Sequence, residues 1–137
     1  MIGSWVIAAF ISFFLWGIMV FLPKLAVGYI SPPSAIIYEV FGGVTVAFGA
    51  LVFLGFQPEF NIKGAALSYA TGIVGFLGTL AYFYAVSKGP VTIVSAISAL
   101  YPLISVAAGI VLLHETMSLR QVIGCLMALG SIILLAF

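Results

Sequence analysis

The residue best placed to do chemistry is Glu39, which lies within the apolar segment 34–43. At 1.5 Å per residue, Glu39 lies roughly 9 Å along a helix that starts at Pro33. A carboxylate in apolar surroundings is costly, and the low dielectric favours its protonated form. Reversible proton binding is therefore the chemistry that this position predicts, which makes Glu39 a candidate for proton coupling. The alternatives are that Glu39 reaches the membrane interface or pairs with Lys24.

The other acids and the single histidine have weaker claims to chemistry. Glu59 lies in a polar loop, where a solvated role is expected. Glu115 and His114 follow the apolar run that ends at Leu113. A carboxylate there can bond free backbone N–H groups, so Glu115 is expected to act as a structural contact at the turn that follows.

The sequence lacks the residues that catalysis, metal binding and nucleic-acid binding require. The sequence has one His and three acids in separate segments, and neither a nucleophile–base pair nor a glycine-rich phosphate loop is recognisable. A single cysteine, Cys125, cannot form a zinc cluster or an intramolecular disulfide. A net charge of +1 offers no basic field for nucleic acid. We therefore expect no enzyme, no metal, no cofactor and no nucleic-acid partner.

The elements that must position Glu39 follow from the composition. Only 5% of the residues are charged and 65% are hydrophobic, whereas soluble domains carry about 25% charge. Charges and prolines cluster in four places and divide the chain into five apolar stretches, each about long enough to cross a bilayer. The prediction is an all-α integral membrane protein with one transmembrane domain over residues 1–137. Its five helices are expected at about 4–22, 33–56, 64–87, 90–113 and 119–137.

The basic residues do not favour one orientation. With five spans, Lys63 and Arg120 fall on one side of the membrane and Lys24 and Lys88 on the other. An excess of Lys and Arg on the cytoplasmic side normally sets the orientation, and here the sides are equal. Either a weak local bias fixes one orientation, or both orientations insert and pair as an antiparallel homodimer.

Small and polar residues at helical spacing mark the faces where helices meet or leave a cavity. On the third span the face includes Gly72, Gly75, Thr79 and Tyr82, and on the fifth it includes Gly124. Close helix packing is the commoner use of such faces, and we assign it to Gly124. The third and fourth spans favour a cavity, because Tyr82 and Pro102 pack poorly among small neighbours. A proline within a helix also bends it, so Pro102 is a candidate hinge.

The sequence resembles the EamA repeat of the drug/metabolite transporter superfamily. The resemblance covers nearly the whole chain and is carried by residues 85–90, Leu100-Tyr101-Pro102, residues 112–118, residues 121–124, Gly130, and Trp16-Gly17 with Lys24. Most members have two such repeats in ten helices, so one copy is similar to the short five-helix bacterial and archaeal branch. Two positions depart from the family pattern: His114 replaces a common glycine, and Glu39 replaces a common basic residue.

The resemblance implies a half-size secondary transporter for a small organic metabolite or drug. It would act by alternating access as a homodimer in the inner cell membrane, with the cavity at the interface between the protomers. The expected cavity residues are Trp16, Thr79, Tyr82, Ser98 and Tyr101. The alternative is a membrane subunit that transports nothing, either a scaffold for a partner complex or half of a flippase.

Overall fold

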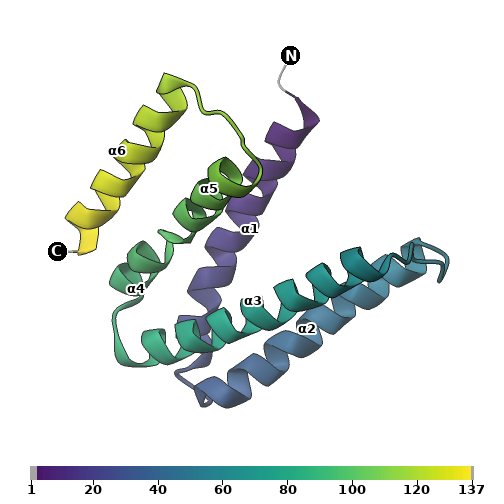
Figure 1. The fold of residues 1–137 in the computed structure, drawn as a ribbon. Coiled ribbons are helices and arrows are strands. Elements are labelled where there is room, and N and C mark those ends of the chain that lie inside the picture. The colour runs from purple at the N-terminus through teal and green to yellow at the C-terminus, as the bar shows by residue number, and fades with distance from the viewer. Residues whose placement is uncertain (1–2, 137) are drawn as a thin grey trace. The chain divides into compact units, whose positions relative to one another are not determined.

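All regular elements of the described chain are helices. The computed structural model describes the backbone of residues 3–136, with side chains over 3–130 and at 133 and 134. The helices are α1 (Ser4–Ala26), α2 (Pro32–Phe53), α3 (Ile62–Lys88), α4 (Val91–Ser98), α5 (Tyr101–Leu112) and α6 (Leu119–Ala136), shown in Figure 1. They divide into two compact units, with α1 to α3 in the first (Met1–Lys88) and α4 to α6 in the second (Gly89–Phe137).

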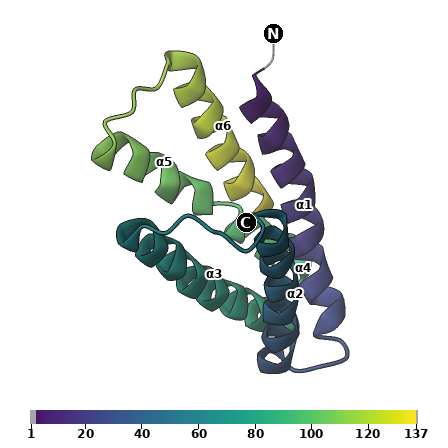
Figure 2. The same ribbon diagram turned by 90° about the vertical axis from the view of Figure 1, so that its right-hand side faces the viewer.

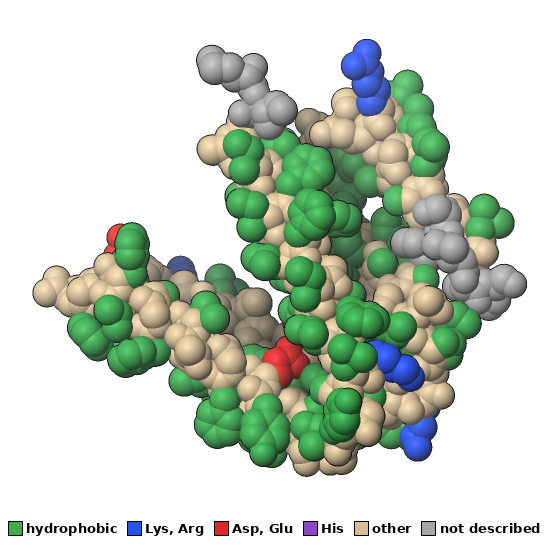
Figure 3. Space-filling view, turned by 180° about the vertical axis from the view of Figure 1, so that it is seen from behind, with side chains coloured by type: hydrophobic (Ala, Val, Ile, Leu, Met, Phe, Trp, Pro, Cys, Tyr) green, Lys and Arg blue, Asp and Glu red, His purple; other side chains and the backbone are tan. Residues whose placement is uncertain are grey.

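The helices have the length and composition of membrane spans. Four helical segments are long and apolar enough to cross a bilayer, namely Ser4–Ala26, Pro32–Phe53, Ile62–Lys88 and Val91–Leu112. The last helix contains a shorter apolar segment, Leu119–Gly130. Hydrophobic side chains are exposed along the helices and charged ones are few in the view of Figure 3, as expected where lipid replaces water. The prediction of an all-α membrane protein is confirmed.

The helix limits differ most from the expected ones in two places. The first helix continues to Ala26, beyond the expected end at Leu22, and includes the buried Pro23. The expected helix 90–113 is two helices, separated by a turn at Ala99 and Leu100 whose backbone dihedrals stay in the right-handed helical region. Pro102 therefore lies in the first turn of α5, where its missing N–H removes no hydrogen bond.

The helix ends are set by local residues. Gly55 has a φ of +60° after α2, and the N–H of Phe56 donates to the Leu51 carbonyl over 3.0 Å, as in a Schellman motif. The Asn61 side chain accepts hydrogen bonds from two backbone N–H groups at the start of α3. Before α6, the Gln121 side chain accepts from the Ser118 N–H at 2.8 Å, as in a capping box.

The first unit is packed most tightly where α2 begins and α3 ends. The two helices are antiparallel neighbours in Figures 1 and 2, and Figure 2 shows them diverging from this end. Ala35, Phe83 and Val86 are buried there. Further along, an ideal Cβ on Gly43 would lie 3.5 Å from the Phe76 ring, which is an ordinary contact. The divergence of α2 and α3 creates the site described next.

Candidate functional site

Two grooves lie in the first unit, and both contain Glu39 in their walls. The larger one, the α2–α3 groove, has a volume of about 510 Å³ and is lined by Met19, Glu39, Gly42, Gly43, Val46, Thr71, Gly72, Gly75, Phe76 and Thr79. The smaller one, the α1–α2 groove, has a volume of about 370 Å³ and is lined by Leu15, Ile18, Met19, Leu22, Pro23, Ala26, Ile30, Ala35, Tyr38, Glu39 and Phe83. Apart from Glu39, neither lining contains a charged side chain.

Glycines make room for the α2–α3 groove. Gly42 on α2 and Gly72 and Gly75 on α3 all line it. An ideal Cβ built on any of these three would meet nothing within 4 Å. Their missing side chains therefore leave open space, whereas a Cβ on Gly43 would contact the Phe76 ring of the opposite helix.

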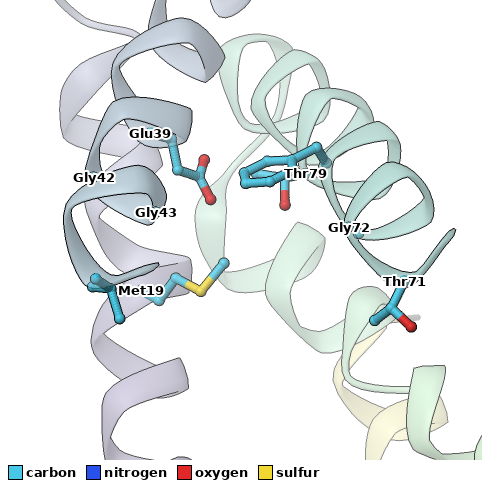
Figure 4. A pocket seen from close by; sticks show the side chains of 10 residues that line it. Met19, Glu39, Gly42, Gly43, Thr71, Gly72 and Thr79 are labelled. Atoms are coloured by element: carbon cyan, nitrogen blue, oxygen red, sulfur yellow. The ribbon is translucent and has the colours of Figure 1, made fainter. Parts of the chain in front are cut away.

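The Glu39 carboxylate is the main polar group of the α2–α3 groove. The side chain is partly buried, and its Oε2 atom is buried without a hydrogen-bond partner among the described residues. Figure 4 shows the carboxylate of Glu39 and the hydroxyl of Thr79 directed into the space between α2 and α3. An unsatisfied buried carboxylate oxygen is uncommon in native structures and calls for an explanation, such as a bound water, an ion or a functional role. It has the chemistry to take up a proton or to bind a cationic group.

A reciprocal pair of hydrogen bonds joins α1 to α3, and we call it the α1–α3 clasp. The Tyr82 hydroxyl on α3 donates to the Val20 carbonyl on α1 over 2.7 Å. The Lys24 ammonium on α1 donates to the Val86 carbonyl on α3, also over 2.7 Å. Both acceptors are backbone carbonyls, and residues 20 and 24 meet residues 82 and 86 in the same order. The two helices therefore run in the same direction at this contact, as first and third membrane spans must.

The expected cavity residues fall in different places. Glu39 and Thr79 line the same groove. Tyr82 belongs to the α1–α3 clasp, and Trp16 lies on α1 with 54% of its surface exposed. Ser98 ends α4 and Tyr101 begins α5, on the two sides of the helix break in the second unit, where Pro102 follows.

Several groove residues carry signals that sequence reasoning had not used. Gly42 and Gly43 follow Glu39 by three and four positions, so they share its face of α2. This spacing places two small residues next to the carboxylate, where helices either pack closely or leave open space. Met19 contributes to both grooves, and it has no distinguishing feature in the sequence beyond its place on the face of α1 that carries Trp16 and Pro23.

Glu115 lies against the last turn of α5 in the second unit. Its backbone N–H donates to the Gly109 carbonyl over 3.1 Å. A Cβ on Gly109 would come within 3.0 Å of the Glu115 carboxylate oxygen Oε2, so the glycine leaves room for that side chain. His114 has a φ of +54°, a left-handed conformation that favours glycine. On α6, Gly124 is exposed and a Cβ there would meet nothing within 4 Å.

The comparison with known families shows to which protein family the chain belongs. A model described as the EamA-like transporter family matches residues 3–137. The chain belongs to the EamA-like transporter family. The left-handed φ of His114 gives a physical reason for the glycine that is common there in the EamA repeat.

One curated relative is similar to part of the chain. The uncharacterized protein MJ1333.1 of Methanocaldococcus jannaschii is 39% identical over 72 residues, which are 51% of this chain and 53% of that protein. The match with this EamA-like chain thus spans about half the length of the relative. No solved structure matches the chain.

Proposed function

We propose that this EamA-like chain is a half-size secondary transporter that moves a small organic metabolite or drug, with Glu39 coupling transport to protons. Membership of the transporter family supports the class of activity. The observation that carries the proposal is the buried Glu39 Oε2, which has no hydrogen-bond partner among the described residues and lies in a groove with no other charged side chain in its lining. Such a groove suits a solute with an apolar body and one polar or cationic group.

The chemistry of the groove explains how proton and solute compete. A deprotonated Glu39 in apolar surroundings gains most from a neutralising partner, either a proton or the cationic group of a solute. Because the same carboxylate oxygens serve both partners, one excludes the other. The release of a proton on one side and a solute on the other then follows from alternating exposure of Glu39.

We also propose that residues 1–137 act as one transmembrane domain of a homodimer in the inner cell membrane. Most family members have two repeats, so a second copy would supply the missing half. The equal division of the four basic residues is compatible with an antiparallel pair. In this proposal Trp16, Ser98 and Tyr101 contribute to the interface cavity, Pro102 acts as a hinge, and Gly124 packs against the partner.

The experiment compares Glu39→Gln with wild type in proteoliposomes under an imposed pH gradient. The probes are ethidium, as a planar cation, and a set of labelled amino acids. We expect wild-type uptake to depend on the gradient, and we expect Glu39→Gln to lose that dependence because an amide does not exchange protons. Glu59→Gln is the control, since Glu59 is an exposed acid outside both grooves.

The two variants separate the candidate functions. If uptake by Glu39→Gln depends on the pH gradient as uptake by wild type does, Glu39 does not couple transport to protons. A wild-type protein that moves none of the probes, in either direction of the gradient, would instead favour the alternative of a non-transporting scaffold or flippase subunit.

A further inference from the structure

The two grooves extend from Glu39 toward opposite ends of α2. The α2–α3 groove follows α2 from Glu39 forward to Val46. The α1–α2 groove follows it from Glu39 back to Ala35, and reaches Ile30 in the loop before the helix. From Ala35 to Val46 the helix rises about 16 Å, roughly half the thickness of a bilayer core. Glu39 thus lies where the two grooves meet.

The antiparallel helix α3 shows the same division. It lines the α2–α3 groove from Thr71 to Thr79, and the α1–α2 groove with Phe83 alone. Because α3 runs opposite to α2, its later residues lie beside the start of α2. Both helices therefore place the α1–α2 groove toward the loop before α2 and the α2–α3 groove toward the loop after it.

Met19 is the other residue, besides Glu39, that lines both grooves. Figure 4 shows its side chain extending from α1 into the space beside α2. Methionine is unbranched and flexible, and a partly exposed side chain changes rotamer within nanoseconds. Because Met19 lines both grooves, a change of its rotamer changes the lining of both.

We propose that Met19 is the gate between the two grooves and determines from which end Glu39 exchanges its proton. This inference rests on the proposed function, because it assumes that Glu39 takes up and releases protons. When the Met19 side chain lies across the junction, Glu39 exchanges protons with one groove at a time. Without that side chain the grooves join at Glu39 and protons pass through without solute.

Among the titratable side chains near the junction of the two grooves, Glu39 is the carboxylic acid. Tyr38 is the other titratable side chain in the two linings. On the flanking helices, Lys24 and Tyr82 donate to the backbone carbonyls of the α1–α3 clasp. A proton that crosses the junction therefore has the Glu39 carboxylate as its acceptor.

The test measures proton flux through Met19→Ala in liposomes that contain a trapped pH-sensitive dye and no solute. We expect a leak several-fold faster than that of wild type, and we expect Met19→Ala/Glu39→Gln to return to the wild-type rate. Met19→Leu keeps most of the side-chain volume and should restore the seal. Met127→Ala is the matched control, because Met127 is an exposed methionine of α6.

A second variant tests the gate by restoring side-chain volume to a protein that is already folded. In a Cys125→Ser background, Met19→Cys should leak, and alkylation of the new thiol should reduce the leak in the same sample. Met19→Ala that elutes and unfolds like wild type but shows wild-type flux would overturn the proposal. So would a leak that persists in the double variant. Failure of proton coupling itself is seen separately, as unchanged pH-dependent uptake in Glu39→Gln alone.

Discussion

Replacing Tyr82 with phenylalanine removes one half of the α1–α3 clasp and leaves the ring in place. Hydrogen bonds between membrane helices contribute about 0.6 kcal/mol on average and about 1.7 kcal/mol at most. The bond from Tyr82 to the Val20 carbonyl is short, at 2.7 Å, and partly buried. We therefore expect a loss in the upper half of that range, about 1 to 1.7 kcal/mol. This corresponds to an increase of about fivefold to eighteenfold in the unfolding equilibrium constant.

The assay is an equilibrium unfolding titration in mixed detergent micelles. Tyr84→Phe is the control, because it makes the same change on the same helix at a side chain that is 63% exposed. Lys24→Met removes the other half of the α1–α3 clasp and should destabilise at least as much, since bonds from charged donors contribute more. If Tyr82→Phe and Tyr84→Phe agree within about 0.3 kcal/mol, the hydroxyl contributes no stability and the reasoning fails.

Two further substitutions test the turn before α6 and the α2–α3 groove. His114→Gly should stabilise the protein by roughly 1 kcal/mol in the same titration, because glycine adopts a positive φ without strain; Leu113→Gly, where φ is −101°, should not stabilise it. Gly75→Leu should block solute uptake with folding retained, because its side chain enters open space in the groove. Gly78→Leu on the same helix also meets open space, but outside the groove lining, and should retain uptake. Equal loss of uptake in both leucine variants would refute the assigned groove.

The helices were largely predictable, because apolar length and loop punctuation are local properties. The break between α4 and α5 was not, although Pro102 was recognised as a point of bending. A proline is equally compatible with a bend inside one helix and with the first turn of a new helix. The described structure has the second arrangement, with a turn at Ala99 and Leu100 between the two helices.

The candidate site was predictable only where a residue type has its own chemical signal. Glu39 is such a residue, since a carboxylate in an apolar segment is rare. Tyr82 and Lys24 have side chains that suit several roles, and their acceptors are backbone carbonyls 62 positions away. Every residue has a backbone carbonyl, so no pattern of residue types in the sequence indicates such a bond.

The glycines show why the sequence alone does not distinguish a glycine that lines a groove from one at a helix contact. Gly42 and Gly43 are adjacent on α2, yet a Cβ on Gly43 would touch the Phe76 ring while one on Gly42 would meet open space. A glycine allows close packing where two helices converge and leaves a groove where they diverge. The divergence of α2 from α3 depends on the buried contacts at one end, formed by Ala35, Phe83 and Val86. The space beside Glu39 is thus a consequence of packing elsewhere in the unit. Substitutions in that buried cluster should change the width of the groove although they leave the Glu39 side chain itself unaltered.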